Sequence, residues 1–327
     1  MKAIINSKYG NAKTMQLLDI QKPIPGDDEV LIKVHAVSIN SWDLGMLNGS
    51  PIFIRMWGLF KPKVNILGSD VAGEVIQVGK NVDRFKVGDR VYGDLVENNW
   101  GGFAQFTCAA QNALTLIPDS LSYIEAAAIP QAACMAYQAL ELASIKEGQT
   151  VLINGAGGGC GSYALQFAKL YGGQVTGVDR TDKLEFMQSI GADHVLDYTK
   201  TDYTTQDKKY DIIIDMVVDK SPKGILKALK EQGQFIMVGG KTLRILQMFA
   251  LSKWYTRRQN KSLRILGAVA NYKLKAVGNI IKDHPNLIHI DKTYDLDKVP
   301  EAMDYIAGGH VKGKIVIDLD SRGSIDS

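Results

Sequence analysis

The sequence is poor in cysteine, has no long apolar run and carries little unbalanced charge. Its 327 residues include three cysteines, Cys108, Cys134 and Cys160, and none of them belongs to a CxxC pair. An odd number of unclustered cysteines excludes a disulfide scaffold and favours reduced thiols in the cytosol. No run of about 18 apolar residues is present to cross a membrane as a helix. The formal net charge of +3 gives no sign of a nucleic-acid partner.

The amino terminus, MKAIINSKYGN, lacks the apolar core of a secretory signal peptide, so we expect a cytoplasmic protein. With 46% hydrophobic and 22% charged residues, the composition is that of a globular protein of about two domains.

A glycine-rich turn at residues 155–161 stands where a dinucleotide-binding site needs one. It follows a short apolar run, VLI, and precedes an amphipathic stretch at helical spacing. Gly158 and Gly159 would let the backbone approach a pyrophosphate, and Gly161 would let the helix lie close to the strand. Cys160, at the helix start among the phosphate-facing amides, belongs to the same cofactor-binding turn and most simply fills a small apolar slot.

The turn departs from a strict GxGxxG at Ala156, and glycine turns also serve simply to reverse a chain. The next segment favours a ligand. Gln174–Val178 has the pattern of a second strand, and Asp179 ends it about 20 residues after the turn. We therefore predict a nicotinamide or adenine dinucleotide site.

The chain divides by pattern into two parts. Residues 1–122 are rich in short strands with Gly and Pro between them, which suggests a β-barrel-like domain. From residue 123, an alanine-rich helical stretch leads to the apolar run and the glycine turn. Five further strand candidates then alternate with helices, which gives six strands in all, as in a complete doubly wound sheet. We assign the tail to the first domain, which gives predicted domains of 1–122 with 272–327, and 123–271.

Three sequence blocks carry a resemblance to a known family. They are GSDVAGEVIQVGKNVDRFKVGDRVYG, NGAGGGCG and SIGADHVLDY, in that order. Together they resemble the medium-chain dehydrogenase/reductase superfamily, and within it the zinc-independent quinone oxidoreductase branch. The resemblance implies an α/β fold: a β-rich GroES-like catalytic domain built from both chain ends, a Rossmann domain with a doubly wound parallel sheet, and an active-site cleft at their junction.

The resemblance also bears on zinc. Zinc alcohol dehydrogenases of this superfamily hold a catalytic zinc with a cysteine, a histidine and a second cysteine. By motif position these places hold Asn40, Ser69 and Gln131, none of which is a good zinc ligand. The structural zinc of those relatives needs four clustered cysteines, more than this chain has. We therefore expect no metal.

Without a Lewis acid, the alkoxide formed by reducing a saturated carbonyl lacks stabilisation. Hydride delivered to a quinone, or to the β-carbon of an enone, gives a delocalised anion that a few hydrogen-bond donors can stabilise. Chemistry and resemblance both favour an NAD(P)H-dependent reductase of quinones or α,β-unsaturated carbonyls. A zinc-free alcohol dehydrogenase or carbonyl reductase and a cofactor-binding protein of low turnover remain open.

The NxxD segment supplies the catalytic candidates. Asn40 would orient the substrate oxygen or the nicotinamide ribose, and Asp43 would hold Asn40 or a proton-relaying water; the alternative is that both cap the next helix. Phe53, Trp57 and Phe60 follow this segment, either as an apolar lid over a flat substrate or as an ordinary buried loop.

Cofactor choice depends on the residues after the second strand of the cofactor domain. Asp179 would bind a ribose 2′-hydroxyl, as in NAD enzymes. Against it stand Arg180, Lys183 and Tyr198, of which the last two match positions that hold the 2′-phosphate in NADPH-binding quinone oxidoreductases. The alternatives are an exposed helix charge for Lys183 and a packing residue for Tyr198. We favour NADP(H), with NAD(H) possible. Further cofactor-binding candidates are Gln131, Val238, Gly239 and Gly240.

The resemblance further implies a homodimer that pairs along an edge strand of the Rossmann sheet, here Ser262–Ala270. This segment is apolar, and an exposed apolar edge needs covering.

The first testable prediction is metal independence. Because the three ligand positions hold Asn40, Ser69 and Gln131, purified protein should contain no stoichiometric zinc by elemental analysis. Activity should also survive chelation by EDTA. Loss of activity on chelation, with recovery on adding zinc, would contradict the prediction.

Overall fold

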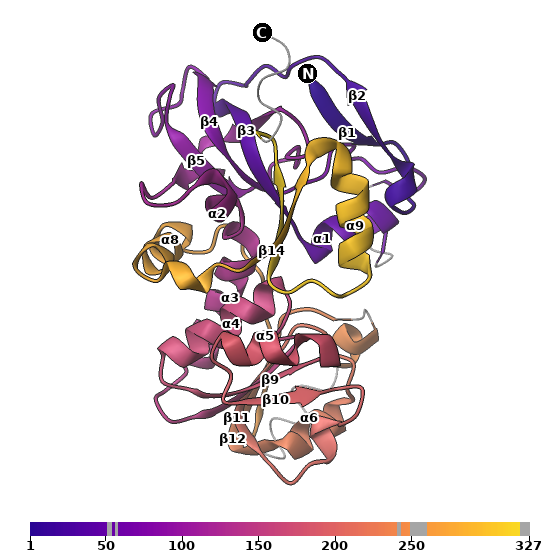
Figure 1. Ribbon diagram of the computed structural model, residues 1–327, viewed down its shortest axis with the longest axis vertical. Coiled ribbons are helices and arrows are strands. Elements are labelled where there is room, and N and C mark those ends of the chain that lie inside the picture. Colours follow the sequence, from indigo (N-terminus) through magenta and orange to yellow (C-terminus); the bar gives the residue numbers. More distant parts are fainter. Residues whose placement is uncertain (51–53, 56–57, 241–242, 249–259, 321–327) are drawn as a thin grey trace. The chain divides into compact units, whose positions relative to one another are not determined.

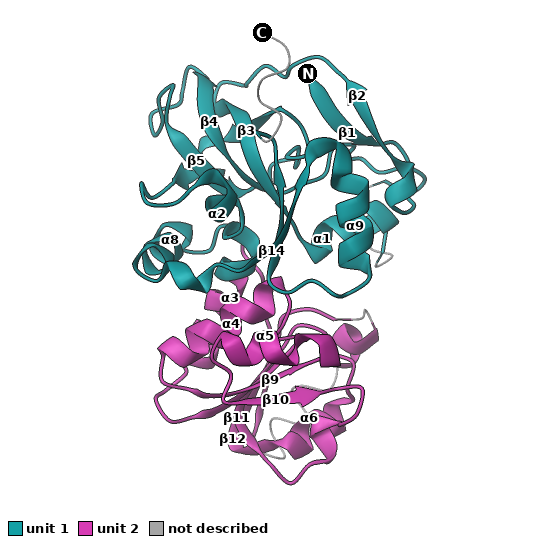
Figure 2. Ribbon diagram, in the orientation of Figure 1, with its two compact units in different colours: residues 1–134, 270–327 teal, residues 135–269 magenta. Residues whose placement is uncertain are grey.

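A computed structural model of the chain describes residues 1–50, 54–55, 58–240, 243–248 and 260–320 (Figure 1). The chain forms two compact units, coloured separately in Figure 2. Unit 1 comprises Met1–Cys134 and Ala270–Ser327, and unit 2 comprises Met135–Val269. The predicted bounds differ at residues 123–134 and 270–271, which group with unit 1. Helix α2 (Tyr123–Ala127) contacts strands β3 (Glu29–Ile39) and β4 (Asp70–Val78) of that unit. The domain bounds stay a prediction.

Unit 1 is built on a seven-stranded sheet with the order β14-β15-β3-β4-β5-β7, and β6 also pairs with β3. A separate antiparallel pair joins β1 and β2. The strands are β1 (Lys2–Asn6), β2 (Met15–Asp19), β3 (Glu29–Ile39), β4 (Asp70–Val78), β5 (Arg90–Asp94), β6 (Phe106–Ala110), β7 (Thr115–Leu116), β14 (Ile290–Asp295) and β15 (Lys314–Asp318). The helices are α1 (Ser41–Asn48), α2 (Tyr123–Ala127), α8 (Leu274–Asp283), α9 (Val299–Ala307) and the first part of α3 (Pro130–Ala143).

Strand β3 organises this sheet. It pairs with β4, β6 and β15, all antiparallel, and is buried along nearly its whole length. The residues of β3 alternate from Val30 to Val37, and the strand continues to Ile39 because its last residues pair with β15 from the carboxyl-terminal end of the chain. β3 therefore delivers Asn40 directly from a strand held on both sides.

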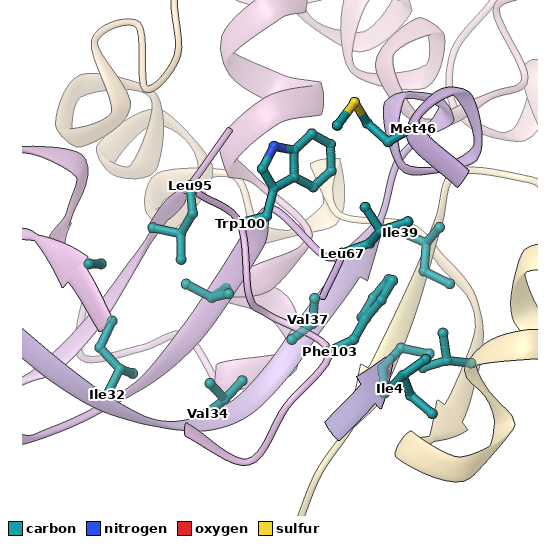
Figure 3. Packing of buried hydrophobic residues seen from close by; sticks show 14 of the residues in the cluster. Ile4, Ile32, Val34, Val37, Ile39, Met46, Leu67, Leu95, Trp100 and Phe103 are labelled. Carbon is teal, nitrogen blue, oxygen red and sulfur yellow. The ribbon is translucent and has the colours of Figure 1, made fainter. Parts of the chain in front are cut away.

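The core of unit 1 combines both ends of the chain. Val299, Ala302 and Met303 of α9 belong to the same buried cluster as the apolar residues of β3. Their burial explains why a carboxyl-terminal segment stays with the amino-terminal domain. Figure 3 shows the part of this cluster contributed by Ile4, Ile32, Val34, Val37, Ile39, Met46, Leu67, Leu95, Trp100 and Phe103.

Unit 2 has a six-stranded parallel sheet with the order β10-β9-β8-β11-β12-β13. This is the strand order of a doubly wound dinucleotide-binding fold, so the predicted fold class is confirmed. The strands are β8 (Thr150–Asn154), β9 (Gln174–Asp179), β10 (His194–Asp197), β11 (Tyr210–Asp215), β12 (Leu229–Met237) and β13 (Ser262–Ile265). Its helices include α4 (Gly159–Leu170), α5 (Leu184–Ser189), α6 (Pro222–Ala228) and the rest of α3.

In the part of the chain that the structure describes, no helix combines the length and the apolar character that a membrane span requires. The cytoplasmic location stays a prediction.

Strand β13 is shorter than the sequence pattern indicates. It pairs with β12 up to Ile265 opposite Met237, and it ends where its partner ends. Leu263 and Leu266 are buried, whereas Ile265 and Val269 are exposed. The edge of the sheet therefore still presents apolar side chains.

From this edge we predict a homodimer whose interface contains Ile265 and Val269. Light scattering at micromolar protein concentration should give the dimer mass, because an uncovered apolar edge favours pairing with a second edge. The double variant Ile265→Glu/Val269→Glu should be a monomer, since it places like charges at the interface. The matched control is Val87→Glu, which changes an exposed valine of unit 1. A monomeric wild type would refute the prediction.

Candidate active site

The site in unit 1 begins where β3 turns into α1. Asn40 is the residue before the first turn of α1 and has an extended backbone. The carboxylate of Asp43 accepts a hydrogen bond from the Asn40 backbone N–H at 2.7 Å and another from the Gly68 N–H at 2.9 Å. Asp43 therefore caps the helix and also fixes the chain just before β4. Asp43 was expected to hold either Asn40 or a proton-relaying water. The structure supports the first role, and Asp43 holds Asn40 by its backbone N–H.

The Asn40 side chain is engaged at both ends of its amide. Its Nδ2 donates to Asp70 Oδ2 at 2.9 Å, and its Oδ1 accepts from Lys314 Nζ at 2.5 Å. Lys314 Nζ lies 3.6 Å from the same Asp70 oxygen, which also accepts from Ser38 Oγ at 3.1 Å. All four side chains are buried. The arrangement is a buried polar network.

Gln131 connects this network to a second aspartate. Its backbone N–H donates to Asp70 Oδ1 at 3.1 Å, and its Nε2 donates to Asp94 Oδ2 at 3.3 Å. Asn271 holds the Asp94 backbone with two hydrogen bonds, of 2.7 and 2.9 Å. The buried Ser69 immediately precedes Asp70. The three positions expected to replace zinc ligands thus gather around Asp70.

Burial dominates the electrostatics of these carboxyl groups. Desolvation raises the pKa of Asp43 to about 7, although two backbone N–H groups oppose the shift. It also raises the pKa of Asp70, against the attraction of the Lys314 ammonium, and that of Asp94. Three buried carboxyl groups near one ammonium cannot all ionise without leaving uncompensated charge. Burial therefore opposes the ionisation of all three carboxyl groups, and the Lys314 ammonium opposes this effect.

Among the described residues, no group of three or more His, Cys, Asp or Glu side chains could hold a metal ion. Metal independence itself stays a prediction.

Sequence reasoning did not assign Asp70, Asp94 and Lys314 to the site. The sequence does contain an indication for Lys314. It is the first residue of the strand KIVID, before three apolar residues, and a lysine in a buried strand rarely lacks a charged partner. For Asp94 no local signal exists, since its partners come from distant parts of the chain.

The glycine turn of unit 2 has the geometry of a pyrophosphate-binding turn. Gly155 has φ of +83°, so it supplies the left-handed residue of the turn. A Cβ on Gly161 would lie 2.0 Å from the Gly155 carbonyl oxygen, which explains the glycine at this close approach of α4. A Cβ on Gly158 would meet one protein atom, at 3.6 Å. The fold itself does not require a glycine at position 158, so the space it leaves fits a ligand that approaches the backbone.

Asp179 forms a compact group with Lys183 at the carboxyl end of β9. Its carboxylate accepts from the Gly157 and Arg180 N–H groups, both at 2.9 Å, and Lys183 Nζ lies 3.6 Å from Oδ1. Lys183 is 5% exposed, which excludes its interpretation as an exposed helix charge. Tyr198 is 46% exposed, and its N–H donates to the Asp179 carbonyl oxygen at 3.1 Å. Its side chain is therefore not a packing residue.

The other predicted site residues lie as follows. Arg180 pairs with Asp182 at 2.9 Å, and Cys160 is half-buried in the first turn of α4. Val238, Gly239 and Gly240 follow β12, and the Val238 N–H donates to the Asp215 carbonyl oxygen at 2.9 Å. Phe60 is 90% exposed, so it is not part of a buried loop. Phe53 and Trp57 lie outside the described residues.

Two family models match the chain. The model described as "Alcohol dehydrogenase GroES-like domain" matches residues 26–119, and the model described as "Zinc-binding dehydrogenase" matches residues 190–317. A quinone-oxidoreductase homolog of Spinacia oleracea chloroplasts is 33% identical over 333 residues, which cover 97% of this chain and 98% of that protein. A 2-methylene-furan-3-one reductase of Solanum lycopersicum is 32% identical over 331 residues, 97% of this chain and 79% of that protein.

Among solved structures, the quinone oxidoreductase from Coxiella burnetii superimposes with a TM-score of 0.87 at 29% identity. The match covers 98% of this chain and 99% of that chain.

The buried pair of Lys314 and Asp70 yields a prediction on stability. Lys314→Met should lower the free energy of unfolding by about 3–5 kcal/mol, because it leaves a buried carboxylate without its cation. Asp70→Asn/Lys314→Met removes both charges and should be more stable than Lys314→Met alone. Lys312→Met, two residues away and half-exposed, should change the stability by less than about 0.5 kcal/mol. Denaturant titration measures all three; equal effects of Lys314→Met and Lys312→Met would refute the prediction.

Proposed function

Because the chain belongs to the medium-chain dehydrogenase/reductase superfamily, in its quinone oxidoreductase-like branch, we propose that it reduces quinones or α,β-unsaturated carbonyl compounds with NAD(P)H. The observation that carries the proposal is the turn after β8. It combines the left-handed Gly155, the open backbone at Gly158 and the start of α4 in the strand order of a dinucleotide-binding sheet.

The residues of unit 2 fit a nicotinamide dinucleotide. The backbone at Gly158 and the start of α4 would hold the pyrophosphate. Asp179, Arg180, Lys183 and Tyr198 would hold the adenosine ribose and its 2′ substituent. A bound reduced nicotinamide supplies the hydride.

The residues of unit 1 act on the acceptor. Asn40 orients the substrate oxygen, and Asp43 holds Asn40 in place through its backbone amide. The acceptor class follows from the chemistry of a site without a metal: a quinone or enone spreads the charge that hydride transfer creates. The names of the two curated relatives agree, since one is called a quinone oxidoreductase homolog and the other reduces a methylene-furanone, which is an enone.

The cofactor preference that we propose is NADP(H). An unpaired Asp179 carboxylate would repel a ribose 2′-phosphate, but the buried Lys183 ammonium lies 3.6 Å from it and compensates its charge. At such a distance an ion pair near a protein surface is worth up to about 4 kcal/mol. A 2′-phosphate therefore meets a compensated pair together with Arg180, whose side chain is one-third exposed.

A panel of acceptors tests the proposed function. With EDTA present, NADPH and NADH oxidation is followed with quinones, enones and simple aldehydes. We expect turnover with quinones and enones and little with aldehydes, because only the conjugated acceptors give a delocalised anion. Turnover confined to aldehydes would indicate a carbonyl reductase instead. Cofactor binding without turnover of any acceptor would indicate a cofactor-binding protein.

Two variants test the cofactor assignment. Lys183→Ala should weaken NADPH binding far more than NADH binding, because only NADPH brings the additional phosphate charge. Asp179→Ser should improve NADPH selectively by roughly 1–2 kcal/mol, about tenfold in affinity, since it frees Lys183 for the phosphate. Fluorescence titration of both cofactors gives the four dissociation constants.

The control for these titrations is Lys169→Ala, which breaks a lysine–aspartate pair with Asp193 in the same unit and should leave both cofactors unaffected. Equal losses of NADH and NADPH in Lys183→Ala would show that Lys183 does not contact the phosphate. Much tighter NADH than NADPH binding by the wild type would show that Asp179 is the ribose ligand.

A further inference from the structure

Lys314 reaches Asn40 through the register of two strands from opposite ends of the chain. β15 runs antiparallel to β3 with Ile315 opposite Ile39, so the residues that adjoin this pair, Lys314 and Asn40, come face to face. Lys314 is 2% exposed. Its ammonium lies 2.5 Å from Asn40 Oδ1, 3.5 Å from the Ile39 carbonyl oxygen and 3.6 Å from Asp70 Oδ2. These three contacts are all with oxygen atoms.

These contacts permit one orientation of the Asn40 amide. An asparagine side chain offers one acceptor oxygen and two N–H donors, and a lysine ammonium can only donate. With Oδ1 on Lys314 and Nδ2 on Asp70, each contact joins a donor to an acceptor. Rotating the amide by half a turn would place N–H against ammonium and carbonyl against carboxylate. Lys314 and Asp70 together exclude that rotamer.

The fixed orientation leaves a defined group for a ligand. One Nδ2 hydrogen binds Asp70, and the second has no acceptor among the described residues. The Asn40 residue is 6% exposed, so it is buried but not wholly sealed from solvent. Asn40 therefore presents a hydrogen-bond donor and withholds its acceptor, which Lys314 occupies.

We propose that Lys314 is a positioning residue that, with Asp70, sets Asn40 as a hydrogen-bond donor to the carbonyl oxygen of the quinone or enone. The inference rests on the proposed function. Hydride transfer places negative charge on that oxygen, which a donor stabilises and an amide oxygen would repel. Lys314 contributes to the rate through Asn40, without touching the substrate.

A double-mutant cycle between Lys314 and Asn40 tests the positioning role. Removing one oxyanion donor typically costs 10²–10³ in kcat, so Lys314→Met, which only releases the amide, should lower kcat for a benzoquinone by about tenfold to a hundredfold. The dissociation constant of NADPH should stay within about threefold, far less than a lost charge contact would cost. In the Asn40→Ala background, Lys314→Met should change kcat less than about twofold, because residues that act as a unit are not additive.

Two further variants separate orientation from folding. Lys314→Arg keeps a cation that can only donate and should retain most of the kcat. Lys314→Gln is neutral and can pair with either orientation of Asn40, so it should lower kcat about as much as is expected for Lys314→Met. It takes the place of Lys314→Met in the cycle if that variant does not fold. Lys312→Met is the matched control on the same segment and should have the kcat of the wild type.

Three results would overturn the inference. One is an equal loss of kcat from Lys314→Met in the wild-type and Asn40→Ala backgrounds, which indicates a structural role alone. Another is a loss of NADPH affinity in Lys314→Met with kcat unchanged, which would show that the Asn40 N–H binds the cofactor and not the substrate. The third is a wild-type kcat in Asn40→Ala, which removes Asn40 from the reaction while leaving the reductase activity in place.

Failure of the proposed function gives a different result, because the wild type would then reduce no quinone or enone. In that case the Lys314–Asn40 contact would be tested by the free energy of unfolding, measured by denaturant titration of the four proteins of the cycle: the wild type, Lys314→Met, Asn40→Ala and the double variant. Additive effects on unfolding would refute the geometry, and non-additive effects would support it.

Discussion

Burial of one ammonium among carboxyl groups is the constraint on which unit 1 depends. Lys314 comes from the carboxyl-terminal part of the chain, and its partners Asn40 and Asp70 come from the amino-terminal part. A buried carboxylate that loses its cation costs several kcal/mol, so the two ends cannot separate without exposing or stranding charge. The apolar cluster shared by β3 and α9 acts in the same direction. Charge pairing and apolar burial thus both close the discontinuous unit.

Unit 2 contains a similar buried pair of an aspartate and a lysine. Asp179 accepts a backbone N–H from the glycine turn and pairs with Lys183, just as Asp70 accepts the Gln131 N–H and pairs with Lys314. In both places a buried aspartate binds a backbone N–H, of the glycine turn or of the first turn of α3, while a lysine compensates its charge. Each unit therefore carries its polar groups in fixed orientations before any ligand binds, which is what preorganised electrostatic catalysis requires.

Local sequence patterns predicted the elements that local physics controls. The apolar run, the glycine turn and the amphipathic helix lie at β8, residues 155–161 and α4. Sequence patterns predicted the ends of strands less reliably, because pairing with a neighbouring strand decides where a strand ends. β3 extends beyond its alternating part because β15 pairs with its end, and β13 stops early because β12 stops. A strand's length depends on its neighbour, which a single segment cannot reveal.

The sequence by itself determined the doubly wound sheet, the dinucleotide turn, the acidic residue after the second strand of the cofactor domain and the NxxD segment, because each depends on residues close together in the chain. The tertiary structure alone decided which groups these residues meet. Asn40 and Lys314 are 274 residues apart in sequence, and no periodicity connects them. Whether Lys183 is exposed or paired with Asp179 depended likewise on burial. Both follow from one physical reason: charge compensation in a protein interior is a relation between distant segments, and it exists only once they pack.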